Sequence, residues 1–150
     1  MNKVDSGSSL VARPRKTTVG CWIAAVAVLA VCVVASTAMT GKTEGGGVFQ
    51  RADAFAMVGL GVLAAAGILL FARPRVWADA KGVRIRNLFG SYDLPWQVVT
   101  KVSFPRGAAW AMLELADDDV VAVMAIQAVD GQYAVDAVRR LRKLLAEAND

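Results

Sequence analysis

The chain has 150 residues, of which 56% are hydrophobic, and its mean hydropathy is +0.45. This composition is too apolar for an ordinary soluble domain and indicates membrane segments. The net charge is +4, but the excess lies mostly in residues 1–18, so the pI near 9.4 gives little support to nucleic-acid binding, which needs a basic stripe on the folded domain. The absence of histidine removes the commonest general base and metal ligand.

Two long uncharged runs follow the N-terminus. Residues 1–18 are interpreted as a basic tail, in which only Asp5 opposes the cations Lys3, Arg13, Arg15 and Lys16. Residues 19–39 and residues 54–72 then contain no charged side chain. As helices these runs are about 30 Å long, which matches the hydrocarbon core of a bilayer. We therefore expect two transmembrane helices.

The charges beside these runs predict their orientation. The connecting residues 40–53 are polar and carry no net charge. The outer flanks are basic, because the tail precedes the first run and Arg73 and Arg75 follow the second. Positive flanks remain in the cytoplasm. We therefore expect a multi-pass protein of the plasma (inner) membrane, with the loop outside and both termini inside.

A cleaved signal peptide is the alternative for the first run. Ser36 and Ala38 resemble a small-residue cleavage site after an apolar stretch. The preceding basic region is long and the run exceeds a normal signal core, so an uncleaved helix is favoured. In either case the second run enters from outside, and the C-terminal domain stays cytoplasmic.

Small residues are frequent in both runs, for example Gly20 and Ala24 in the first and Gly59 and Gly61 in the second. Such residues let helix backbones approach closely within lipid. A tight antiparallel hairpin is the favoured interpretation. Contact with the helices of another protein is the alternative, and the sequence does not separate the two.

Residues 73–150 are predicted to form strands followed by a helix. Pro74 ends the second apolar helix. Alternating apolar and polar residues then predict about six short antiparallel strands, at residues 76–79, 83–86, 92–94, 99–104, 109–115 and 120–126. After Asp130, the predicted N-cap, apolar residues recur at helical spacing over residues 131–148. We expect this amphipathic helix to cover the strands.

The order of motifs in this domain resembles a known family. The features are the segment from Trp77 to Ser91 with its turn glycines, Leu94-Pro95-Trp96, Arg106-Gly107 and Trp110-Ala111. They are similar to the bacterial pleckstrin-homology-like (PH) domain of small actinobacterial membrane proteins, one branch of which is called low-molecular-weight protein antigen. The resemblance covers residues 76–127. It implies a bent antiparallel barrel or sandwich of seven strands capped by the C-terminal helix, so either one strand is missed or the barrel is reduced.

Lys81, Arg84 and Arg86 form a candidate lipid-headgroup site, with a lysine on a turn and two arginines on the next strand. They resemble the basic pattern of phosphoinositide-binding PH domains, and each cation near an anionic leaflet adds about 1 kcal/mol of attraction. The solvent face of an ordinary strand has the same alternation. A domain that is already tethered by two helices gains little from weak lipid affinity, so a solvated face is favoured.

Trp77 and Trp110 form a candidate protein interface, because the alternation puts both opposite the aliphatic residues of their strands. Exposed aromatic residues are frequent in interfaces and at membrane surfaces. For Trp77 and Trp110, burial within their own domain is an equally favoured interpretation. For Trp96, core packing is favoured.

The sequence contains no arrangement that indicates catalysis. It has neither a Walker-type glycine run nor a cysteine in residues 73–150, and three consecutive aspartates on one turn, Asp117 to Asp119, do not converge on a metal ion as oxygen ligands do. We expect no cofactor and no metal. The favoured function is a non-enzymatic, membrane-anchored binding module that serves as an accessory or assembly subunit. Its expected partners are the bilayer, other membrane proteins or a second copy of the chain; the alternative function is an anionic-lipid sensor.

Overall fold

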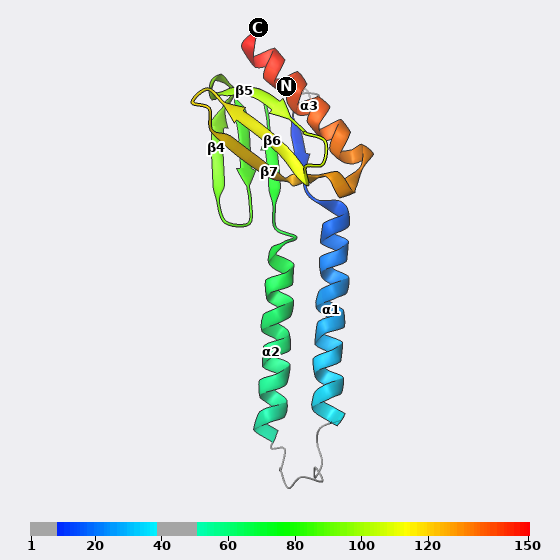
Figure 1. The fold of residues 1–150 in the computed structure, drawn as a ribbon. Helices are drawn as coiled ribbons and strands as arrows, with labels where there is room; N and C mark the ends of the chain where they lie inside the picture. The colour runs from blue at the N-terminus through cyan, green and yellow to red at the C-terminus, as the bar shows by residue number, and fades with distance from the viewer. Residues whose placement is uncertain (1–8, 39–50) are drawn as a thin grey trace, which may run out of the picture. The chain divides into compact units, whose positions relative to one another are not determined.

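The computed structural model describes residues 9–38 and 51–150. The chain divides into two compact units, which we take separately (Figure 1). One unit contains residues 17–72, and the other contains residues 1–16 together with residues 73–150. Residues 1–8 of the predicted tail and most of the predicted loop, residues 40–53, lie outside the described residues.

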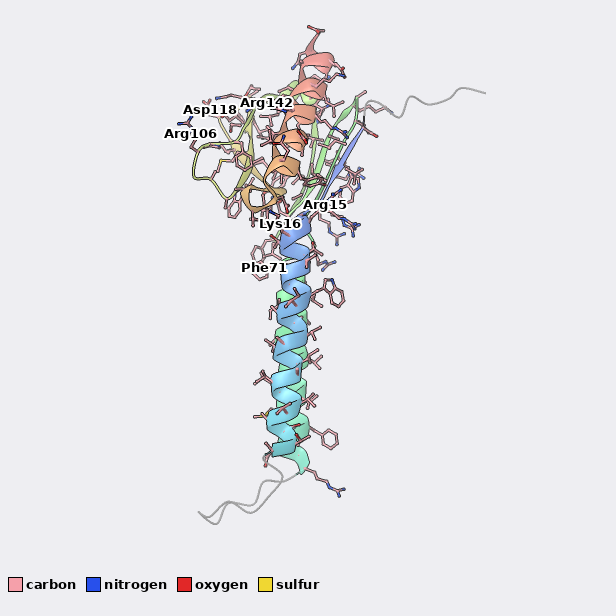
Figure 2. All side chains as sticks on the ribbon, turned by 90° about the vertical axis from the view of Figure 1, so that its right-hand side faces the viewer. Arg15, Lys16, Phe71, Arg106, Asp118 and Arg142 are labelled. Atoms are coloured by element: carbon pink, nitrogen blue, oxygen red, sulfur yellow. The ribbon has the colours of Figure 1, made fainter. Side chains whose placement is uncertain are left out.

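The first unit consists of two apolar helices, α1 (Arg15–Ala38) and α2 (Arg51–Leu70). Both are long and apolar enough to cross a membrane. Few of their side chains are buried, and Figure 2 shows them projecting outward along both helices. A helix of a soluble core would instead be covered by its own protein.

The two apolar helices pack closely at Gly61. A Cβ atom added to Gly61 would lie 2.8 Å from the Cβ atom of Cys32, so only glycine fits there. Ala25 and Ala65 are also buried in this unit. This contact agrees with the tight hairpin that the small residues predict.

The second unit is a sandwich of two antiparallel sheets with a helix (Figure 1). The first sheet has the order β1 (Leu10–Ala12), β2 (Arg75–Ala78), β3 (Gly82–Arg86) and β4 (Ser91–Pro95). The second has the order β5 (Val99–Ser103), β6 (Trp110–Leu115) and β7 (Val120–Gln127). Short 3-10 helices, η1 (Trp96–Val98) and η2 (Ala128–Asp130), precede β5 and α3 (Gln132–Asn149). From β2 onward, the strands and α3 agree with the predicted ones to within one residue at each end, whereas η1 and η2 were not predicted.

The core lies between the sheets and α3. The inward residues of each strand alternate with exposed ones, as the period of two requires. Trp96 is completely buried, which confirms its expected place in the core. The apolar stripe of α3 closes the sandwich through Ala134, Ala137, Val138, Leu141, Leu144 and Leu145. On the same helix, Arg142 (labelled in Figure 2) donates from Nε to the carbonyl oxygen of Val102 over 3.0 Å.

Strand β1 is the seventh strand of the sandwich, and the sequence pattern did not predict it. Leu10 and Ala12 are buried in the core, while Val11 between them is 63% exposed. Leu10 pairs with Ala78, and Ala12 pairs with Val76. These three residues fall within the predicted basic tail, residues 1–18, but they belong to the first sheet. Three residues beside a long apolar run are too few for alternation to predict a strand.

The two apolar helices are therefore an insertion between β1 and β2. Because β1 and β2 are antiparallel neighbours, the end of β1 and the start of β2 lie side by side. Both connections to the helices depart from this end of the sandwich, which we call the helix end. The turn between β3 and β4 lies at the same end, because Arg86 at the end of β3 is paired with Arg75 at the start of β2.

Asp130 does not cap α3, contrary to the expectation from sequence. Gly131 holds the N-cap position of α3, with φ of 57°, and no side chain caps that helix. The buried Asp130 carboxylate instead accepts hydrogen bonds from the backbone N–H groups of Arg15 (3.1 Å) and Lys16 (2.9 Å). These two residues begin α1 and are labelled in Figure 2. Arg15 also stacks on the ring of Tyr133, 4.3 Å from its centroid. Asp130 thus caps a helix more than a hundred residues earlier in the chain.

The burial pattern of β1 predicts opposite effects of the same substitution at neighbouring positions. Ala12→Asp puts an unpaired carboxylate into the core and should lower the free energy of unfolding by about 3 kcal/mol or more. Val11→Asp leaves its carboxylate in solvent and should change that free energy by less than about 1 kcal/mol. Thermal unfolding of the full chain in detergent, followed by near-ultraviolet circular dichroism, measures both. Equal effects would show that β1 is not part of the sheet.

The Asp130 cap predicts a local effect at the start of α1. Asp130→Ala should lower stability by about 1 kcal/mol and speed hydrogen exchange of the Arg15 and Lys16 amides. Asp136→Ala is the control, because Asp136 lies on the exposed side of α3, where it contacts Arg139. Exchange mass spectrometry of the full chain compares the two variants. Unchanged exchange in Asp130→Ala would contradict the cap.

Candidate functional site

The outer face of the first sheet carries a row of four residues, one from each strand. The register puts Val11 beside Trp77, Trp77 beside Arg84, and Arg84 beside Asp93. Neighbouring residues on these strands point inward to the core, so this row faces outward. Trp77 is half-buried and the other three are exposed. The row therefore combines an indole with an ionic pair.

Arg84 and Asp93 form the ionic pair of this row. The Arg84 Nη2 atom lies 2.6 Å from Asp93 Oδ2, and Nε donates to the same oxygen over 3.0 Å. The hydrogen bonds and the charge of Asp93 raise the pKa of Arg84 above its ordinary value. Both side chains are about two-thirds exposed, so the pair is available to an incoming polar group and contributes little to folding.

The turn between β2 and β3 forms the boundary of the site at the end opposite the helix end. Asp79 Oδ1 accepts from the backbone N–H groups of Lys81 (2.8 Å) and Gly82 (3.2 Å). The buried Trp96 donates from Nε1 to the carbonyl oxygen of Asp79 over 2.7 Å. A Cβ atom at position 82 would collide with the backbone oxygen of Leu94, so glycine is required. These contacts fix the turn and hence the position of Lys81.

A hollow of about 520 Å³ lies beside this turn. It is lined by Trp77, Asp79, Lys81, Gly82, Arg84, Asp93, Leu94 and Pro95. Its apolar surface comes from an indole, a leucine and a proline, and charged groups of both signs surround it. A short polypeptide segment with an apolar side chain and polar neighbours matches this lining.

The structure divides the predicted lipid-headgroup residues between two ends of the domain. Lys81 and Arg84 line the hollow, whereas Arg86 does not. Lys81 and Arg86 are five residues apart along an extended strand, or about 17 Å. Because β1 precedes the helices, the turn with Lys81 is also the second connection of the sheet and not the first. The three cations therefore do not surround one headgroup.

The two candidate interface tryptophans lie on different sheets. Trp77 belongs to β2, and Trp110 begins β6, where it pairs with Gln127. Both are half-buried. Only Trp77 lines the hollow. Asp93 is the residue of this site that was not predicted. Its ion pair with Arg84 follows only from the register of β3 and β4.

Metal-ligating side chains do not gather in the described part of the chain. Within residues 9–38 and 51–150, no group of three or more acidic or cysteine side chains is placed to hold a metal ion. The Asp117 and Asp119 side chains lie at the turn between β6 and β7, where Asp117 Oδ1 accepts from the Asp119 N–H over 3.3 Å.

Comparison with known proteins defines the class. Residues 73–144 match a family model described as a bacterial PH domain. An uncharacterised protein of Mycobacterium bovis and two from strains of Mycobacterium tuberculosis are each 44% identical over 137 residues, which cover 91% of this chain and 88% of the relative. No solved structure matches the chain.

The chain belongs to the family of bacterial PH-domain proteins that includes these mycobacterial relatives. The family model begins after α2, so it does not include β1. The aligned 137 residues leave out too few positions to exclude either apolar helix. The alignment with the relatives therefore extends beyond the residues that the PH-domain model matches.

Arg84→Ala tests whether the ionic pair of the site has a structural role. Because both charges are exposed and screened by solvent, we expect the free energy of unfolding to stay close to that of the unsubstituted chain. Chemical denaturation of the full chain in detergent measures this change. A large loss of stability would show that the pair holds β3 to β4 and is not available for binding.

Proposed function

We propose that this protein is a membrane-anchored, non-enzymatic binding module whose PH-like domain captures a segment of another protein. The first part of the proposal is that α1 and α2 span the membrane. Their length and composition support it, as does the exposure of their apolar side chains, which no other part of the described chain covers. Lipid is the surrounding that makes such a pair of helices stable.

The position of β1 supports an uncleaved α1. Cleavage after Ala38 would remove β1 from the edge of the first sheet. It would also remove the two N–H groups that satisfy the buried Asp130 carboxylate. A carboxylate left without its partners inside a protein is strongly destabilising. The sandwich thus needs the residues that precede α1.

The distribution of charge supports a cytoplasmic domain. Arg13, Arg15 and Lys16 surround the start of α1, and Arg73 and Arg75 follow α2. Cations at both outer flanks favour retention on the cytoplasmic side of the inner membrane. Both termini and the whole sandwich would then lie inside the cell.

The hollow on the outer face of the first sheet is the observation that carries the binding function. It lies at the end of the sandwich opposite the helix end, where a membrane would not cover it. Trp77 supplies the kind of large, partly buried aromatic surface that dominates protein interfaces. We infer that the partner is another membrane protein, for which this chain serves as an accessory or assembly subunit.

Site-specific photo-crosslinking in native membranes tests this function. A photoreactive amino acid at position 77, in the hollow, should yield a discrete adduct, whereas the same group at Thr100, exposed on β5, should not. Arg84→Glu should reduce the adduct at position 77 by tenfold or more, because it places two acids opposite each other in the site. Mass spectrometry then identifies the adduct.

Lys101→Glu provides the matched control for that experiment. Lys101 forms an exposed ion pair with Glu114 on the second sheet, 3.3 Å apart, so its reversal makes the same change of charge away from the hollow. Equal loss of the adduct in both variants, or no adduct at position 77, would contradict the assigned site. External protease acting on a C-terminal reporter in intact cells would contradict the cytoplasmic orientation.

A further inference from the structure

We propose that the turn between β3 and β4 is a third membrane contact, at which Phe89 enters the lipid interface while neighbouring arginines bind anionic headgroups. This inference rests on the proposed membrane anchoring by α1 and α2. It assigns a role to a side chain that the binding hollow does not use. The observation that carries it is the position of an exposed phenylalanine on a fixed turn at the helix end.

Phe89 is 93% exposed, the largest exposed fraction among the large apolar residues of the described chain. A single exposed apolar residue is ordinary on a protein surface. Phe89, however, lies at the tip of the β3–β4 turn, between Arg86 and Ser91, and that turn is at the helix end. It therefore projects from the end of the sandwich where the chain connects to both apolar helices.

Asn87 holds this turn against the second sheet. Its Nδ2 atom donates to the carbonyl oxygen of Ala122 over 2.7 Å, and its Oδ1 atom accepts from the Met124 N–H over 3.2 Å. The Asn87 N–H also donates to the carbonyl oxygen of Gly90 over 2.7 Å. The turn is thus fixed before it meets any partner, and little conformational entropy is lost when Phe89 is buried.

The chain length keeps the helix end close to a membrane that α1 and α2 cross. Only Arg13 and Pro14 separate β1 from α1, and residues 71–74 separate α2 from β2. Fully extended, these connections reach no more than about 10 and 17 Å. The headgroup layer on each side of the hydrocarbon is roughly 5–8 Å thick. The helix end is therefore held within reach of the headgroups.

The charges at the helix end match an anionic bilayer surface. Arg13, Arg73, Arg75 and Arg86 gather there, and within the described residues none of them forms an ion pair. The acidic turn from Asp117 to Asp119 instead precedes β7, at the opposite end of that strand from Asp130 and the start of α1. An anionic surface attracts the first group and repels the second, which favours one orientation of the sandwich.

A fluorescent probe at position 89 tests the contact in the full chain. The native cysteines, Cys21 and Cys32, are replaced by serine, and a single cysteine at position 89 or 120 carries an environment-sensitive fluorophore. Val120, 57% exposed at the start of β7, is the matched apolar control. In nanodiscs that contain phosphatidylglycerol, doxyl-labelled lipid should quench the probe at position 89 and leave the probe at position 120 unaffected.

Charge variants and a second probe make the outcomes distinct. Arg75→Gln with Arg86→Gln should weaken the contact about fivefold for each charge removed, whereas Arg139→Gln with Arg140→Gln on α3 should not. Soluble glycerol phosphate in excess should not displace the probe, because the contact needs the bilayer. A third chain keeps Cys21 as the labelled cysteine, and quenching there reports that α1 lies in lipid.

If the probe at position 21 is quenched and the probe at position 89 behaves like that at position 120, the membrane contact is wrong while the anchoring stands. Displacement by glycerol phosphate would show a phosphate site instead and would also overturn the proposal. If the probe at position 21 is not quenched, the anchoring fails and this inference fails with it.

Discussion

The structure depends on the pairing of β1 with β2 across an insertion of two apolar helices. Two strands that are neighbours in the sheet are separated in the chain by residues 13–74. The outer edge of β2 therefore has backbone hydrogen-bond partners only when β1, the segment before α1, pairs with it. The hydrogen bonds of Asp130 to the start of α1 strengthen the same closure, because they tie the end of the second sheet to the first connection. The apolar helices are thus connected to the sandwich at two adjacent points, and not by one flexible tether.

The two connections to the apolar helices are both short. Only Arg13 and Pro14 separate β1 from the capped first turn of α1, and residues 71–74 separate α2 from β2. Because β1 and β2 are antiparallel neighbours, both connections leave the sandwich at the same end. The hollow beside Trp77 lies at the other end of the sandwich, away from both connections.

Most of the fold is predictable from local patterns, and the failures have a common physical cause. The period of two and the turn glycines predicted β2 to β7, and the amphipathic spacing predicted α3, because each of these elements is long enough to repeat its pattern. Strand β1 and the role of Asp130 depend on contacts between residues that are distant in sequence. An aspartate before an amphipathic helix has the local chemistry of an N-cap, but α3 begins at Gly131 and the carboxylate serves α1 instead. Local chemistry indicates that such a side chain caps a helix, and only the fold determines which helix.

The same reasoning applies to the cations of β3 and its turn. In the sequence, Lys81, Arg84 and Arg86 form one basic motif, and that motif suggests one anionic ligand. On an extended strand, successive residues on one face advance by almost 7 Å, so a motif that is compact in sequence extends from one end of the domain to the other. Arg84 is then paired with Asp93, and Lys81 lines the hollow. Arg86 lies with the other arginines at the helix end. The proposed membrane contact and the proposed partner site both depend on this division of one motif between two surfaces.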